Sequence, residues 1–389
     1  MTDLFYDSDV DDDVDNLSSL DTQESVAVHK PVDGPAPLFG LSGVEARLLT
    51  MIAENRIPHA LLFHGQRGVG KFTTALRLAR TLLAYGADIG NDAAEGLFGP
   101  APAIQSLNTP DHHPAVHLIS AGAHPDLLIL GGEDAEKSKS GMILIDEARK
   151  VPGFLRLKPS TDNGWRVVII DNADKLNRNA QNALLKILEE PPACAILILI
   201  THHLGPILPT IRSRAQTLRF SPLTDDDFES WLKRTDVHLD PQAKSWIRTL
   251  SQNCPGQAQM MMDLDAPALI DDFLKIWTGF PNLNDLAWVD YAERLSALEP
   301  EAYAYVFSFW VWWLSAMIHA KVDNAAATRL KQMTGNGMME NYMNIRTLGQ
   351  MIDIRDAVDT IRTRTLGSSL EKRQALFSAR MCMTHSSAA

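Results

Sequence analysis

A glycine-rich loop near the start of the chain has the residue types and spacing of a phosphate site. Gly65, Gly68, Gly70 and Lys71 lie in the segment Gly65-Gln-Arg-Gly-Val-Gly-Lys71, which follows a short apolar run. In such a loop the backbone N–H groups turn toward phosphate oxygens, the lysine neutralises negative charge, and the next helix directs its positive end at the anion. The pattern therefore predicts a loop derived from a nucleotide site, with ATP or ADP as its ligand.

The residue that follows this loop argues against hydrolysis. A working loop continues with Ser or Thr, whose hydroxyl binds Mg²⁺, whereas this chain has Phe72. Thr73 comes one residue late, and a helical step of about 100° turns its side chain away from the metal. Two interpretations stay open, a weak and vestigial nucleotide site or a loop kept only as a structural turn. We expect no bound metal ion under either interpretation.

The elements that must position this loop alternate between strand and helix. Apolar, β-branched runs predict strands at 61–64, 127–130, 167–170 and 196–200. Helices are expected at 72–84, directly after the loop, and at 183–190, where two prolines stop the helix. Alternation of this kind predicts an α/β fold in which a mostly parallel sheet is covered by helices on both faces.

Four motifs in this order resemble the ATPase core of the AAA+ clamp-loader family, and within it the delta-prime branch of bacterial DNA polymerase III. They are the glycine loop, the run Val167-Val-Ile-Ile-Asp171, the segment Asn182-Ala-Leu-Leu-Lys-Ile-Leu-Glu-Glu-Pro-Pro192, and Ile211-Arg-Ser-Arg214. The resemblance extends over residues 38–220. It implies an AAA+ (RecA-like) parallel sheet covered by helices, then a small helical lid and an all-α C-terminal collar domain.

Compared with this family, the chain has lost further parts of an ATPase site. Asp171 is followed by Asn172, where working members have a glutamate that serves as the base for the attacking water. An amide cannot accept a proton at neutral pH, and general-base catalysis is worth ~10²–10⁴-fold. Thr201 matches the polar sensor of related ATPases, but Gln257 replaces an arginine of the second domain. We therefore expect ATP or ADP to bind weakly, without turnover by this chain.

One arginine of the family pattern is retained. Clamp-loader subunits share a Ser-Arg-Cys motif whose arginine enters the ATP site of a neighbouring subunit, and this chain has Ser213-Arg214-Ala215. A guanidinium suits that task because it is always charged and spreads several donors over phosphate oxygens. The resemblance predicts that Arg214, with Ser213, is a trans arginine finger on a short helix. Arg212 is a weaker candidate.

Charge is concentrated in the first 37 residues. They hold ten Asp or Glu against one Lys, so they carry −9 of the formal −12 and leave −3 for the rest of the chain. High charge with few apolar residues predicts an acidic disordered tail. The expected organisation is this tail at 1–37, an AAA+ ATPase-like domain at 38–220, a helical lid at 221–266 and a helical collar at 267–389.

Metal, membrane and disulfide functions are disfavoured. Many delta-prime relatives carry a four-cysteine zinc module before an Ala-Gly-x-His-Pro-Asp stretch, but this chain has no cysteine between Phe72 and Ala193. The nearby His112, His113 and His117 do not supply four closed ligands, so no zinc is expected. The uncharged run 302–318 has 17 residues and reads as a buried helix rather than a membrane span. Three scattered cysteines fit a reducing cytoplasm.

The resemblance implies a role in DNA replication. We expect the rigid stator of a hetero-oligomeric clamp loader, within the DNA polymerase III holoenzyme, that helps place a sliding clamp on primed DNA. Its partners would be the gamma or tau and delta subunits, and through them the clamp and DNA. One alternative is an active gamma- or tau-like motor, which needs the missing catalytic residues. The other is a stand-alone DNA-dependent ATPase, which the near-neutral charge of residues 38–389 disfavours.

Overall fold

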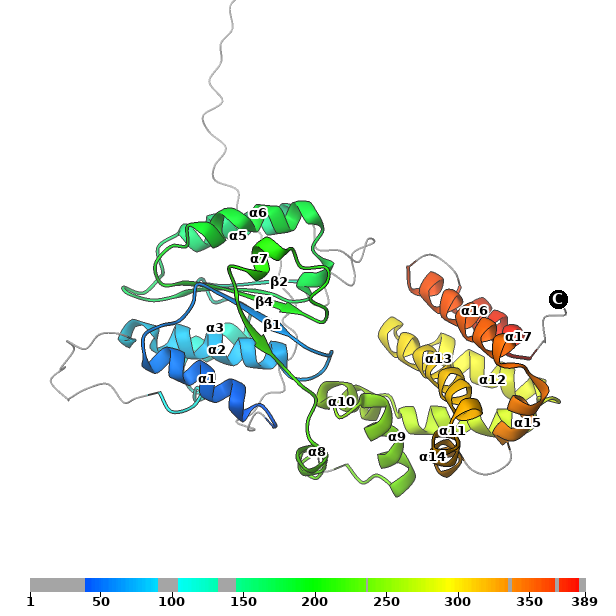
Figure 1. The fold of residues 1–389 in the computed structure, drawn as a ribbon. Coiled ribbons are helices and arrows are strands. Elements are labelled where there is room, and N and C mark those ends of the chain that lie inside the picture. The colour runs from blue at the N-terminus through cyan, green and yellow to red at the C-terminus, as the bar shows by residue number, and fades with distance from the viewer. Residues whose placement is uncertain are drawn as a thin grey trace, which may run out of the picture.

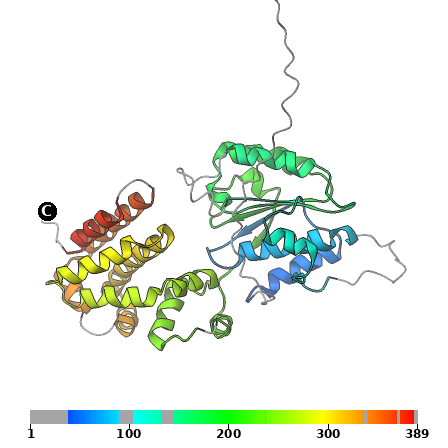
Figure 2. The same ribbon diagram turned by 180° about the vertical axis from the view of Figure 1, so that it is seen from behind.

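The computed structural model describes most of the chain after the predicted tail. The described residues are 39–89, 104–131, 145–235, 237–334, 338–367 and 371–384. The predicted acidic tail at 1–37 lies outside the described residues. Figures 1 and 2 show an α/β part followed by two groups of helices.

A five-stranded parallel sheet forms the centre of the α/β part, in the order β2-β3-β4-β1-β5. Its strands are β1 (Ala60–His64), β2 (Leu127–Leu130), β3 (Arg166–Ile170), β4 (Ala195–Thr201) and β5 (Gln216–Arg219). The first four strands lie within one residue of their predicted positions. The prediction missed β5, because Gln-Thr-Leu-Arg is a short edge strand with one buried residue and no apolar run to identify it.

Helices cover both faces of the sheet (Figure 1). On one face lie α1 (Ser42–Ala53), α2 (Lys71–Tyr85) and α3 (Pro114–Ser120). On the other lie α5 (Ile145–Arg156), α6 (Arg178–Glu189) and α7 (Pro209–Arg212). Short 3₁₀ turns occur at η1 (Gly86–Asp88) and η2 (Ala173–Lys175).

The sequence located α2 closely but placed the start of α6 too late. The prediction for α6 began at residue 183, whereas the helix begins at Arg178. Asn177 ends the preceding turn, and its side chain accepts a hydrogen bond from the backbone N–H of Ala180 at 2.8 Å. The missed start is therefore an asparagine N-cap, which the apolar spacing of the helix did not reveal.

Successive residues of each central strand enter different cores. Leu61, Phe63 and Ile198 pack toward α1 and α2, whereas Leu62 and Leu197 pack toward α5 and α6. This burial on both faces explains why the strands are nearly continuous apolar runs. Together with the helical region that follows, it confirms the predicted fold class.

Two helical groups follow the sheet. The first contains α8 (Asp225–Leu232), α9 (Pro241–Ser251) and α10 (Pro255–Asp263), which we call the lid. The second, which we call the bundle, begins at Ala266. It consists of α11 (Ala266–Trp277), α12 (Asp285–Ser296), α13 (Pro300–Val322), α14 (Asn324–Thr334), α15 (Met338–Ile345), α16 (Leu348–Gly367) and α17 (Lys372–Thr384).

Helix α13 contains the long uncharged run and is largely buried in the bundle. Trp310, Leu314 and Met317 have no exposed surface, and the ring of Phe273 from α11 stacks on Trp310 with centroids 5.4 Å apart. Within the described residues, no helix combines the length and apolarity needed to cross a membrane.

Candidate functional site

The parallel sheet brings the predicted phosphate-loop residues to one edge. The loop follows β1, Asp171 follows β3 and Thr201 ends β4, so all three lie at the carboxyl ends of neighbouring strands. Gly70 is the N-cap residue of α2, with a left-handed φ of 93°. This edge is where open parallel sheets bind ligands.

Lys71 is turned inward and fully bonded by its own chain. Its side chain is buried, with the whole residue 4% exposed. The ammonium donates to the carbonyl oxygens of Gly65 and Gln66 at 2.7 and 2.6 Å, and lies 3.0 Å from Nδ1 of His202. An ammonium has three N–H donors, so these three acceptors account for all of them. In this arrangement no donor of Lys71 is left for a phosphate oxygen.

The electrostatics agree with this bonding. Burial lowers the pKa of Lys71 to about 8, although the carboxylates of Asp171 and Asp174 oppose the shift. Burial, followed by the positive charge of Lys71, lowers the pKa of His202 to about 4. At pH 7 the imidazole is therefore neutral, and one ring nitrogen can accept a hydrogen bond from the lysine ammonium. The sequence analysis did not identify His202. Its place directly after Thr201, the last residue of β4, could have indicated that it lies near the loop.

The lid closes over the same loop. The backbone N–H of Gly256 donates to the carbonyl of Gly68 at 2.8 Å, and the side-chain amide of Gln257 donates to the carbonyl of Arg67 at 3.2 Å. A Cβ on Gly68 would lie 2.7 Å from the backbone nitrogen of Gln257, and Gly68 has a left-handed φ of 81°. Only glycine allows this approach, so Gly68 serves lid packing in this structure.

A second group of contacts fixes the first half of the loop. The thiol of Cys254 donates to Oε1 of Gln66 at 3.2 Å, and Cys254 is buried in the core that lies under α2. A Cβ on Gly65 would come within 2.1 Å of the carbonyl oxygen of Phe220, in the chain leaving β5. The loop is thus held from both sides by segments more than 130 residues away in sequence.

The other predicted site residues are engaged in structural contacts. Phe72 is half-buried against the core beneath α2. The backbone N–H of Asn172 donates to Oδ1 of Asp171 at 2.9 Å, in a left-handed turn. The hydroxyl of Thr201 is buried and lies 3.3 Å from Oδ1 of Asp174. The site therefore has a carboxylate after β3 but neither a hydroxyl at position 72 nor a carboxylate at position 172.

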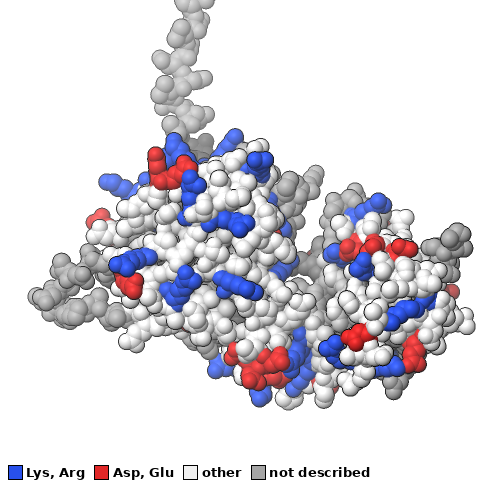
Figure 3. Space-filling view, in the orientation of Figure 1, with Lys and Arg blue, Asp and Glu red and all other residues white. Residues whose placement is uncertain are grey.

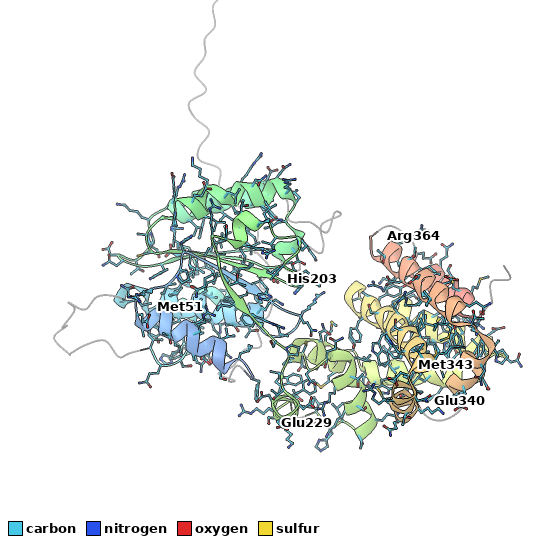
Figure 4. All side chains as sticks on the ribbon, in the orientation of Figure 1. Met51, His203, Glu229, Glu340, Met343 and Arg364 are labelled. Carbon is cyan, nitrogen blue, oxygen red and sulfur yellow. The ribbon has the colours of Figure 1, made fainter. Side chains whose placement is uncertain are left out.

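An open pocket of about 630 Å³ lies beside the loop, between the sheet edge and the lid. His64, His202 and His203 line it together with Arg67 and Arg219. His203 lies at the carboxyl end of the sheet, on the side nearest the lid (Figure 4). Burial and then the charge of Arg219 lower the pKa of His64. Two arginines and no carboxylate are among its lining residues, so the pocket would attract an anion.

The predicted finger arginine lies apart from the loop, on the α6 and α7 face. Helix α7 ends at Arg212, so Arg214 is in the following turn and not on the helix as predicted. Its guanidinium donates to Oε1 of Glu189 at 2.8 Å and to the carbonyl of Thr210 at 3.1 Å. The side chains of Arg214 and Glu189 are 36% and 53% exposed. Ser213 donates to the same Thr210 carbonyl at 3.1 Å.

The histidines considered for zinc have structural roles or lie at the surface. His113 caps α3, accepting a hydrogen bond from the N–H of Ala115 at 3.2 Å, and its ring packs on Tyr85. His112 and His117 lie nearby on the same segment. Among the residues that the structure describes, no group of three or more His, Cys, Asp or Glu is arranged to hold a metal ion. The absence of zinc stays a prediction.

Comparison with known proteins shows that the α/β part is similar to subunits of DNA polymerase III. The family model described as "DNA polymerase III, delta subunit" matches residues 42–224. DNA polymerase III subunit delta' of Pseudomonas aeruginosa is 38% identical over 204 residues, covering 52% of this chain and 55% of that protein. DNA polymerase III subunit delta' of Bacillus subtilis is 32% identical over 190 residues, covering 49% of this chain and 50% of that protein. The chain thus matches about half the length of these relatives.

A solved structure gives a broader but weaker match. It is a gamma subunit-related protein of DNA polymerase III from Thermotoga maritima, 17% identical, with a TM-score of 0.42, covering 88% of this chain and 98% of that one.

Proposed function

We propose that the chain is the stator of a clamp loader. The proposal rests on the match of residues 42–224 to the DNA polymerase III delta-subunit family model and on the similarity to two bacterial delta' subunits. As the stator, the chain helps to load a sliding clamp onto primed DNA in the cytoplasm. It donates Arg214 to the ATP site of a neighbouring subunit and does not hydrolyse ATP itself.

The observation that carries the proposal is the self-bonded phosphate loop. All three donors of Lys71 go to acceptors of this chain, and the lid is hydrogen-bonded to the loop carbonyls of Arg67 and Gly68. A phosphate oxygen that bonds to Lys71 would have to displace one of its three acceptors. Even then, Phe72 offers no metal ligand and Asn172 offers no base. A loop that is already bonded to its own lysine and lid suits a stator better than a motor that opens and closes around ATP.

The exposure of Arg214 supports a role outside this subunit. The guanidinium lies at the surface, and among the described residues it is held by Glu189 and the Thr210 carbonyl. An exposed ion pair contributes about 0–1 kcal/mol, so a neighbouring triphosphate can attract the arginine away at little cost. Arg212, the last residue of α7, is also exposed and provides a comparison residue on the same turn.

The bundle is the part that we propose to contact other subunits. Leu286, Val322, Ile345 and Met381 are large apolar side chains of the bundle that stay exposed in the isolated chain. Exposed apolar residues on a helical surface mark contacts with other proteins when they gather in patches. The expected partners are the gamma or tau and delta subunits, and the sliding clamp and DNA are reached through the complex.

On the face of the molecule seen in Figure 3, basic side chains do not gather into one surface for DNA. Lys and Arg are spread over the α/β part, while an acidic patch lies over α8 (Figure 3). The first turn of α8 carries Asp225, Asp226 and Asp227. A phosphate backbone would be repelled from this part of the lid.

Affinity purification of the tagged full chain from its own cells tests the proposal directly. The expected result is copurification of the other loader subunits, together with clamp-loading and ATPase activity that require the added motor subunits. The isolated chain should release no phosphate from ATP, with or without primed DNA. Turnover by the isolated chain that disappears in Lys71→Ala would contradict the stator assignment.

A further inference from the structure

We infer that the His202 side chain is an internal ligand of the phosphate-loop lysine, and that it limits how tightly this loop binds any phosphate-bearing molecule. The inference deepens the proposed function, since it rests on a subunit that keeps its loop closed. His202, which lies 131 positions after Lys71 in the sequence, would then be a residue that determines the ligand affinity of the loop.

The geometry makes His202 the one removable acceptor of Lys71. The other two acceptors, at 2.7 and 2.6 Å, are backbone carbonyls of Gly65 and Gln66, which no side-chain substitution can delete. The third is Nδ1 of His202 at 3.0 Å, a side-chain atom. A phosphate oxygen that approaches Lys71 must replace one of these three acceptors. The imidazole is the one that can move by side-chain rotation alone.

Neighbouring groups hold the backbone at His202 in place and keep its imidazole neutral. The backbone N–H of His202 lies 3.4 Å from Oδ1 of Asp174, which also accepts from the hydroxyl of Thr201. The charges that face the ring are the cations Lys71 and Arg67 and the carboxylate of Asp174. The two cations disfavour protonation of the ring, and burial adds to their effect. Nδ1 lies 3.0 Å from the ammonium, and in the neutral tautomer that carries its proton on Nε2, the Nδ1 lone pair accepts the hydrogen bond of Lys71.

The chemical class of the competing ligand follows from the donor. A buried ammonium at the start of α2, beside a pocket with two arginines, would take a diphosphate or triphosphate group. Loss of the imidazole acceptor leaves one donor of Lys71 unsatisfied in a buried place. A phosphate oxygen would then restore that hydrogen bond, whereas in the wild-type chain it only exchanges one bond for another.

The test compares two kinds of substitution at position 202 in the full chain. His202→Phe keeps a ring but removes the acceptor, whereas His202→Asn keeps a side-chain oxygen near the position of Nδ1. Pyrophosphate and ADP are titrated by calorimetry, without a partner subunit. His202→Phe should bind both ligands roughly tenfold more tightly than wild type, as expected for a hydrogen bond to a charged group. His202→Asn and the control His238→Ala, at an exposed histidine of the lid outside the pocket lining, should stay near the wild-type affinity.

A second readout does not depend on ligand binding. Acylation of the native protein by an N-hydroxysuccinimide ester, followed by peptide mass spectrometry, reports how available the Lys71 amine is. Lys71 should react faster in His202→Phe than in wild type, and His202→Asn should remain protected. If the phenylalanine variant does not fold, His202→Leu takes its place in both measurements.

Two results would overturn the inference. One is an acceptor-free variant that folds and binds pyrophosphate within twofold of wild type. The other is a His202→Asn chain that binds as tightly as His202→Phe, because side-chain size and not the acceptor would then set the affinity. Either result leaves the stator assignment intact. That assignment fails only if the wild-type chain hydrolyses ATP or does not join the loader.

Discussion

Replacement of Arg214 separates its function from its contribution to stability. In the isolated chain, Arg214→Ala removes an exposed pair with Glu189, 2.8 Å long, and one bond to the Thr210 carbonyl. Such a pair is worth about 0–1 kcal/mol, so the free energy of unfolding should fall by no more than about 1 kcal/mol. Urea denaturation of the purified chain measures this change.

In the assembled loader the same substitution should have a much larger effect. Arginine fingers in phosphoryl-transfer systems contribute ~10³–10⁵-fold in rate, or about 4–7 kcal/mol at 1.4 kcal/mol per decade. The ATPase rate of the adjacent motor site should fall by that order, although the other motor sites dilute the total. Arg214→Lys should rescue poorly, since an ammonium lacks the planar fork. Single-turnover ATP hydrolysis in the reconstituted complex is the assay.

Matched controls lie on the same surface. Arg212→Ala changes an exposed arginine two residues away and should have a smaller effect on ATPase. Glu189→Gln weakens the pair that holds Arg214, and Glu190→Gln alters the charge next to it. An assembled Arg214→Ala loader that hydrolyses ATP and loads clamps at wild-type rates would refute the trans-finger reasoning. The chain would then be a structural subunit only.

Three further outcomes are expected. The isolated chain should show no steady-state phosphate release above that of a Lys71→Ala control, in an assay with and without primed DNA. Elemental analysis of the untagged protein should find well under one zinc per chain, and a full equivalent lost on replacing His112, His113 and His117 would contradict this. The pKa of His202 is about 4 in the folded protein, against an ordinary value of 6.5. Between these two pH values the unfolded chain binds more protons than the folded chain. The free energy of unfolding should therefore fall as the pH decreases from 6.5 toward 4. Urea titrations at several pH values should show a smaller decrease for His202→Asn, and an equal decrease would contradict the assignment.

The sequence by itself was enough to predict the α/β architecture and to show that residues of the catalytic motifs are replaced. Apolar runs near 61–64, 167–170 and 196–200 predicted three central strands, because a strand buried on both faces must be apolar at successive positions. Phe72 and Asn172 are facts of the covalent chain, and no packing can give them a hydroxyl or a carboxylate. The family resemblance could be read from the same residues.

The tertiary structure alone decided what the loop residues touch. The bond between Lys71 and His202 joins positions 131 apart, and the bond between Gly256 and Gly68 joins the lid to the loop. Such pairs have no local signature, because each residue type fits many environments and the partner is set by how the helices pack on the sheet edge. Edge strand β5 was missed for a related reason, since its pairing with β1 and not its own side chains makes it a strand. The sequence therefore identifies a phosphate loop, and only the fold shows that its lysine is already satisfied by the protein itself.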